Sequence, residues 1–310
     1  MSITVRADAW LLEPAPARRL AALRILVGGY ALVFLLSRLP GLLQVTRLPD
    51  RQFEPVGPLW WMDSPLSSRV AQLALFAVIA LAVAFVAGWR HRVTGPAFAL
   101  GFLMVTTYRV SFGHILHTDH LPAAHVLVLG FAPSAAAWSL DARRARSRSI
   151  EPPDDARFGW PIRLMAVITA IGYVLAGLAK LRYGGNDWLT GDVLRNHIAY
   201  DNLRKALIGT FWSHPGGWIV QYAWLFPPLA IATTIIELGA VAVATRGRLR
   251  TIEVGLLWLF HVGTAVFMAI GFPYPLSGIA FACCFRAERI IEWVLVKLPT
   301  GSRPASVNTT

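Results

Sequence analysis

The sequence of 310 residues contains only two cysteines, the adjacent pair Cys283 and Cys284. This scarcity excludes a disulfide framework, a Cys-x-x-Cys redox motif and a zinc site built from thiolates. Charged residues are also scarce, at 15% of the chain, whereas soluble globular proteins have about a quarter. Hydrophobic residues make up 55%, and the mean hydropathy is +0.53. The composition therefore predicts a membrane protein.

Apolar runs of about 20 residues, the length that crosses a bilayer as a helix, recur along the chain. We place eight of them at residues 20–39, 70–88, 93–112, 121–140, 161–182, 221–245, 252–272 and 274–293. The sequence therefore predicts an all-α polytopic bundle of about 8 transmembrane helices. It divides into an N-terminal tail (1–19), one transmembrane domain (20–297) and a C-terminal tail (298–310).

The net charge of +12 is explained by the placement of the basic residues. With the N-terminus inside, the cytoplasmic segments hold 17 Lys and Arg residues and the outer segments hold 6. This asymmetry follows the positive-inside rule and predicts that both termini are cytoplasmic, in a multi-pass protein of the cell (inner or plasma) membrane. It also argues against nucleic acid as a partner, because the basic residues serve as topology anchors.

A few ionisable residues fall inside the predicted spans, where each is costly unless it is paired or solvated. Lys180 lies near the outer end of the fifth span, and Gly172 and Ala176 precede it at four-residue spacing. This small-residue face predicts a close approach of another helix, with Lys180 pointing inward. Glu237 lies deep in the sixth span and requires a partner such as Lys180, Arg24 or Arg109. For Arg24 we favour snorkelling to the cytoplasmic face.

Histidines are concentrated at the third-to-fourth loop, which contains His114, His117, His120 and His125. A metal site, a proton-handling site and a merely polar outer surface are the three interpretations of this cluster. Di-iron membrane oxygenases need several such clusters, so we predict no metal. His261 lies near the middle of the seventh span, where a hydrogen bond between helices and a catalytic role are both open.

The topology brings three of these residues toward one face of the membrane. His120 is at the outer mouth of the fourth span, Lys180 at the outer end of the fifth, and His261 within about 16 Å of the outer end of the seventh. A cavity open to the outer side can join all three. Partial withdrawal from water disfavours an ammonium group, so Lys180 can act there as a base.

At these same residues the sequence resembles the family of vitamin K-dependent gamma-carboxylase and its bacterial relatives, the HTTM (horizontally transferred transmembrane) domain proteins. The most specific stretch is Tyr173-Val-Leu-Ala-Gly-Leu-Ala-Lys180-Leu, followed by Asp187-Trp188-Leu-Thr-Gly191. It is similar to the family segment that carries the catalytic lysine. The Asp119-His120 step, and Phe260-His261 through Gly271-Phe272-Pro273-Tyr274, resemble two segments that carry histidines.

The resemblance implies a carboxylase of the carbon–carbon lyase class. In this reaction Lys180 deprotonates a reduced vitamin K-type (menaquinol-like) hydroquinone, and oxygen adds to its anion. The resulting strong base removes a γ-proton from a glutamate, which captures carbon dioxide, and the quinone leaves as an epoxide. The resemblance assigns catalytic roles to Lys180, His120 and His261, and cofactor-binding roles to His261, Tyr173 and Glu237.

The resemblance also implies a short, bacterial-type member without the large C-terminal lumenal domain of the animal enzyme. The expected partners are the lipid bilayer, an extracytoplasmic peptide or protein substrate and a quinone reductase. The outer segment 183–219 is expected to cover the cavity or lie flat in the interface. Two alternatives stay open: a non-enzymatic partner in maturation, export or immunity of a secreted peptide, and a quinone or small-molecule binding or transport module.

Overall fold

The computed structural model describes residues 8–113, 117–145 and 153–297. Within these ranges the chain is helical and forms no strand, apart from an isolated β-bridge between Ala15 and Asp155. Five helical segments of the described chain are long and apolar enough to cross a membrane. They are α2 (Ala17–Ser37), α4 (Ser68–Ala87), Ala156–Leu189 with α8 (Ala156–Ala179), Ala223–Ala244 with α12 (Phe226–Gly239), and α13 (Arg248–Met268). The prediction of an all-α membrane protein is confirmed.

Shorter or more polar helices connect and cover these segments. They are α3 (Leu39–Val45), α5 (His91–Val110), α6 (His120–Phe131), α7 (Leu140–Ala145), α9 (Gly185–Leu189), α10 (Asp192–Leu207), α11 (His214–Ile219), α14 (Pro273–Leu276) and α15 (Glu288–Lys297). Three short segments have another helical geometry. One is the π-helical turn η4 (Lys180–Gly184), and two are the 3-10 helices η6 (Ala240–Ala244) and η7 (Ile279–Cys284). The predicted span at 93–112 corresponds to α5, whose terminal Arg92 and Arg109 make it less apolar than the five segments above.

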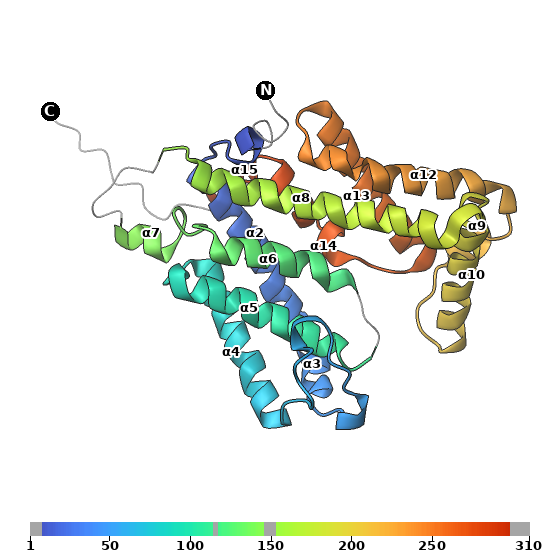
Figure 1. Ribbon diagram of the computed structural model, residues 1–310, viewed down its shortest axis with the longest axis horizontal. Helices are drawn as coiled ribbons and strands as arrows, with labels where there is room; N and C mark the ends of the chain where they lie inside the picture. The colour runs from blue at the N-terminus through green and yellow to red at the C-terminus, as the bar shows by residue number, and fades with distance from the viewer. Residues whose placement is uncertain (1–7, 114–116, 146–152, 298–310) are drawn as a thin grey trace.

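Helix α8 runs along the molecule and contacts α2, α6, α12, η6 and η7 (Figure 1). On one side α2, α4, α5 and α6 pack against one another, and on the other α12 lies alongside α8 and α13 packs on α12 and η6. The chain turns at the far end of α8 through α9 into α10, which crosses the ends of the neighbouring helices (Figure 1). This arrangement places the ends of α8, α12 and α13 around a common space.

Two of the eight predicted spans are not continuous helices. The segment predicted at 121–140 is helical only through Phe131, because Ala132 adopts an extended conformation before Pro133. A residue that precedes proline is sterically driven out of the helical region. The segment predicted at 274–293 is divided into α14, η7 and α15, and Gly278 between the first two has a φ of 76°. Glu288 of α15 pairs with Arg19 at the start of α2, at 2.9 Å.

Arg24 is completely buried, so the expectation that it snorkels to the cytoplasmic face is wrong. Its guanidinium donates hydrogen bonds to the carbonyls of Phe85 at 2.8 Å, Ser134 at 3.1 Å and Trp138 at 2.6 Å. Phe85 lies in the last turn of α4, where carbonyls have no partner within the helix. Ser134 and Trp138 belong to the irregular segment after α6, whose backbone needs partners at this depth. Arg24 therefore joins these two parts of the bundle.

The close approach of a helix to α8 occurs at Gly177 and not at Gly172. A Cβ atom on Gly177 would lie 3.1 Å from the Cβ of Glu237 and 3.1 Å from the side chain of Leu238, both on α12. A Cβ atom on Gly172 would meet nothing within 4 Å. The predicted close approach is therefore not on the face of Gly172 and Ala176, where Gly172 borders an open space. It lies at Gly177, which is on another side of α8 and admits α12.

Replacement of Gly177 by leucine is expected to destabilise the protein by about 1–3 kcal/mol, because the added atoms overlap α12. The matched control is Gly172→Leu, which adds the same atoms about one and a half turns earlier on the same helix and should leave stability near its original value. Thermal unfolding of both variants in detergent micelles measures the difference. Equal melting temperatures for the two variants would show that Gly177 does not set the spacing of α8 and α12.

Candidate active site

One cavity of about 680 Å3 lies among α6, α8, α10, α12 and α13. Its volume is within the range of small-molecule sites, about 300–1,000 Å3. The lining includes all five residues to which the sequence analysis assigned a role: Tyr173, Lys180, His120, Glu237 and His261. Gly172 and Ala176 also line it, so the face of α8 that carries Lys180 points into this cavity. The structure thus brings the candidate residues together, and their chemical roles stay predictions.

Lys180 and Glu237 form an ion pair inside the cavity. The Lys180 Nζ atom lies 2.7 Å from Oε2 of Glu237, and the side chains are 18% and 3% exposed. The expected partner of Glu237 is thus Lys180, since Arg24 bonds to carbonyls and Arg109 pairs with Asp119. The same ammonium lies 4.7 Å from the ring centroid of Trp188. A carboxylate and an aromatic face both stabilise an ammonium that has left bulk water.

The backbone at Lys180 departs from the regular α-helix. Helix α8 ends at Ala179, and Lys180–Gly184 forms a π-helical turn before α9 begins. Such turns are rare and are frequently found at functional sites. Tyr173 lies two turns before Lys180 on the same face of α8, so the two side chains enter the cavity one above the other.

Tyr173 and His261 form the second polar pair of the cavity. The Tyr173 hydroxyl lies 2.7 Å from Nε2 of His261, which joins α8 to α13. The His261 ring is enclosed by aromatic groups, with the Phe272 ring centroid at 5.0 Å and the Phe260 centroid at 5.3 Å. His261 therefore makes the interhelical hydrogen bond that the sequence left open, and it borders the cavity as a catalytic group would.

His120 enters the cavity from a different element. It is the first residue of α6, and its side chain is exposed where it lines the cavity. The preceding Asp119 is buried and forms an ion pair with Arg109 of α5. This pair fixes the start of α6 and hence the place of His120.

His125, a further member of the histidine cluster, is not at the cavity surface in the same way. His125 is fully buried; its Nδ1 atom lies 2.7 Å from the Tyr274 hydroxyl and its Nε2 atom 3.1 Å from Thr169 Oγ1. His114 lies outside the described residues, as does the side chain of His117. In the part of the chain that the structure describes, no three His, Cys, Asp or Glu side chains are placed to hold a metal.

Two cavity residues were missed as site residues in the sequence. Trp188 is 7% exposed and donates a hydrogen bond from Nε1 to Thr234 Oγ1 at 2.9 Å, which holds its ring beside Lys180. In the sequence Trp188 stood in the stretch that resembles the family, but no role was assigned to it. His197 of α10 lines the cavity from the segment 183–219, which confirms that this segment covers part of it. An isolated histidine on a polar helix carries no signal that would place it there.

Comparison with protein families decides the membership of this chain. The family model for the HTTM domain matches residues 12–289. The chain belongs to the HTTM domain family. The matched range of this HTTM domain includes every described residue of the cavity. Comparisons with curated proteins and with solved structures gave no match.

Proposed function

We propose that this HTTM domain protein is a quinol-driven carboxylase of the vitamin K-dependent gamma-carboxylase type. The observation that carries the proposal is the Lys180–Glu237 pair, 2.7 Å apart in a cavity that also contains Tyr173, His120 and His261. Withdrawal from water favours the neutral amine of a lysine, and an adjacent acid can take up its proton. The family resemblance supports the same assignment, because Lys180 lies on the position of the catalytic lysine.

The cavity fits a flat, lipid-soluble quinol. Trp188, Phe260 and Phe272 supply aromatic walls, and most of the lining surface is apolar. When bound, the reduced quinol supplies an acidic hydroxyl and the oxidisable ring on which the coupling to carbon dioxide depends. Tyr173, His261 and Glu237 are the residues that would hold its oxygen atoms.

Lys180 accepts the proton from the hydroxyl in this proposal. To do so the ammonium must first lose a proton, and the nearest acceptor is the Glu237 carboxylate at 2.7 Å. In an apolar cavity a neutral amine and a neutral carboxylic acid avoid the cost of two buried charges. Glu237 therefore both holds Lys180 in place and removes its proton. Tyr173 fixes the His261 ring, and His120 at the exposed side can exchange protons with water.

We also propose that the N-terminus is cytoplasmic and that the cavity mouth is extracytoplasmic, in the inner or plasma membrane. The excess of basic residues in segments on the N-terminal side of the bilayer supports this orientation. An extracytoplasmic peptide would then reach the cavity from outside, and a quinone reductase in the membrane would regenerate the quinol.

The orientation predicts which introduced cysteines react in intact cells. Gln52→Cys is expected to react with a membrane-impermeant maleimide, whereas Arg248→Cys reacts only after the membrane is permeabilised. Both positions are exposed, while the native Cys283 and Cys284 are buried. The reverse labelling pattern would place the cavity mouth in the cytoplasm.

The proposed activity is tested with the purified protein in vesicles supplied with reduced vitamin K, oxygen, labelled bicarbonate and a glutamate-containing peptide. Epoxide formation with label in the peptide supports the carboxylase. Epoxide without label retains quinol chemistry but overturns glutamate as the acceptor. Neither product, together with a peptide or transporter that co-purifies with the protein, would favour the non-enzymatic partner. Quinone binding without either product would favour a binding or transport module.

A further inference from the structure

The second half of helix α10 turns two polar residues, Asn202 and Lys205, toward the protein and turns its large apolar residues away. Tyr200, Leu203 and Leu207 share one helical face by their spacing, and they are 68%, 60% and 77% exposed. The opposite face carries Ile198 and Asn202, which are buried. In water this pattern would be reversed, because a surface helix turns its apolar stripe to the core.

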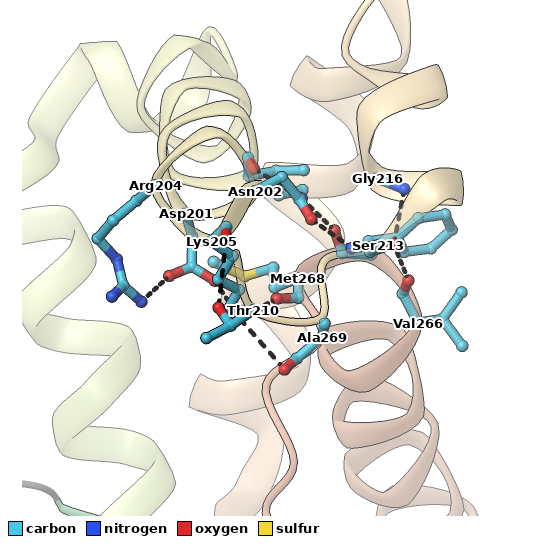
Figure 2. Close-up of polar contacts among 12 residues, drawn as sticks. Asp201, Asn202, Arg204, Lys205, Thr210, Ser213, Gly216, Val266, Met268 and Ala269 are labelled. Carbon is cyan, nitrogen blue, oxygen red and sulfur yellow. Dashed lines mark hydrogen bonds and ion pairs between the residues drawn. The ribbon is translucent and has the colours of Figure 1, made fainter. Parts of the chain in front are cut away.

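The inward polar residues of α10 are bound to the end of α13 (Figure 2). Asn202 donates from Nδ2 to the Phe267 carbonyl at 2.9 Å, and Lys205 donates from Nζ to the Met268 carbonyl at 2.6 Å. The last carbonyls of a helix have no partner within it, so these bonds complete α13. Asp201 in turn accepts from Lys205 at 2.6 Å. The orientation of α10 is therefore fixed by specific bonds.

Asp201 forms ion pairs with Arg204 and Lys205 at this contact. Partial burial raises the pKa of the Asp201 carboxyl, but the hydrogen bonds from Lys205 and Arg204 outweigh burial and bring that pKa below its ordinary value. Asp201 is thus held as a carboxylate facing Lys205. The apolar face of α10 is consequently directed outward by the same interactions that satisfy α13.

The exposed apolar surface continues beyond α10. The loop that follows carries Ile208 and Phe211, which are 60% and 81% exposed. Tyr183, Trp218 and Trp224 are exposed on neighbouring segments, and Trp and Tyr are enriched where a bilayer meets water. The spanning helices α8 and α12 also carry exposed apolar side chains, such as Leu175 and Ile235, as lipid-facing surfaces do.

We propose that α10 and its loop through Phe211 lie in the interfacial layer of the bilayer, with Tyr200, Leu203 and Leu207 among the acyl chains. Helix α10 crosses the ends of α8, α12 and α13, which is the orientation of a helix in the membrane plane (Figure 1). The helix also lines the cavity with Leu194 and His197. The lipid surface is therefore the partner that holds α10, and with it one wall of the cavity, in place.

Collision of spin labels with relaxing agents tests this placement without reference to activity. Labels at Leu207→Cys and Phe211→Cys are placed in a Cys283→Ala, Cys284→Ala background and reconstituted into vesicles of phosphatidylethanolamine and phosphatidylglycerol. Two labels set the scale: Ile235→Cys on the exposed side of α12 for lipid, and Gln52→Cys in an exposed turn for water. A label at Leu203→Cys repeats the measurement on the same face.

The expected result is that labels at 207, 211 and 203 collide at least about tenfold more often with oxygen than with a water-soluble nickel chelate, as at Ile235. Labels that instead collide mainly with the nickel chelate, as the label at Gln52→Cys does, would overturn the proposal. They would show that the apolar face is open to water, as a docking surface for a peptide or protein requires. Monodisperse elution in detergent establishes that each labelled variant is folded.

Discussion

Replacing Lys180 by arginine is expected to leave the protein folded and to lower quinol epoxidation at least about 100-fold, the usual contribution of a positioned base. Arginine keeps the positive charge, so the ion pair with Glu237 and the contact with the Trp188 ring can persist. A guanidinium stays protonated in proteins and cannot serve as a base. The variant therefore separates the chemical role of Lys180 from its structural role. Epoxide formation and thermal unfolding are measured on the same preparation.

Lys297→Arg is the matched control for this variant. Lys297 ends α15 and lies over the Trp293 ring at 3.9 Å, and it does not line the cavity. Its replacement should leave the rate unchanged. If Lys180→Arg retained most of the epoxidation rate while the fold was preserved, Lys180 would be a structural cation and not the base.

The largest effect on stability is expected at Arg24. Replacement by methionine keeps most of the side-chain volume but leaves the carbonyls of Val86, Ser134 and Trp138 without donors. The Phe85 carbonyl keeps its bond from the Gly88 backbone. Each buried carbonyl that loses its partner costs about 1–3 kcal/mol, so the sum is on the order of 3 kcal/mol or more. At roughly 2–4 °C per kcal/mol for a chain of this size, the melting temperature in detergent should fall by about 6 °C or more.

Arg38→Met provides the comparison on the same helix, since Arg38 follows α2 and its guanidinium lies over the Phe34 ring at 4.7 Å. Loss of that contact should cost about 0.5–1 kcal/mol. Arg24→Lys should fall between the two, because one ammonium cannot reach carbonyls on two sides. A melting temperature for Arg24→Met equal to that of Arg38→Met would show that Arg24 is not the joint between α4 and the segment after α6.

The class of the protein and the place of its polar pair could be predicted from residue chemistry. Ionisable groups inside apolar runs must find partners, and this requirement placed Lys180 among three candidate partners of Glu237, from which the structure selects it. The spacing of Gly172, Ala176 and Lys180 placed Lys180 on an inward face of α8, and the topology placed His120 and His261 toward the same side of the membrane. Tyr173 was assigned by the family resemblance. The structure puts all five residues on one cavity.

The features that were mistaken depend on the backbone and on neighbouring helices. The partners of Arg24 are carbonyls, which every residue possesses, so no side-chain pattern marks them. Pro133 did mark the end of α6, but the apolar residues on both sides outweighed it in a count of hydropathy. The choice between Gly172 and Gly177 depends on the direction of α12, which the sequence of α8 does not contain. For the same reason His197 could not be assigned to the cavity.

Epoxide produced from reduced vitamin K in matched membrane vesicles, with the unaltered protein and with Lys180→Ala at equal amounts, tests the central claim most directly. The unaltered protein is expected to form epoxide in the presence of oxygen, and Lys180→Ala to form at least about 100-fold less. Equal epoxide from both proteins, or none above protein-free vesicles from either, would contradict a quinol-driven reaction with Lys180 as its base.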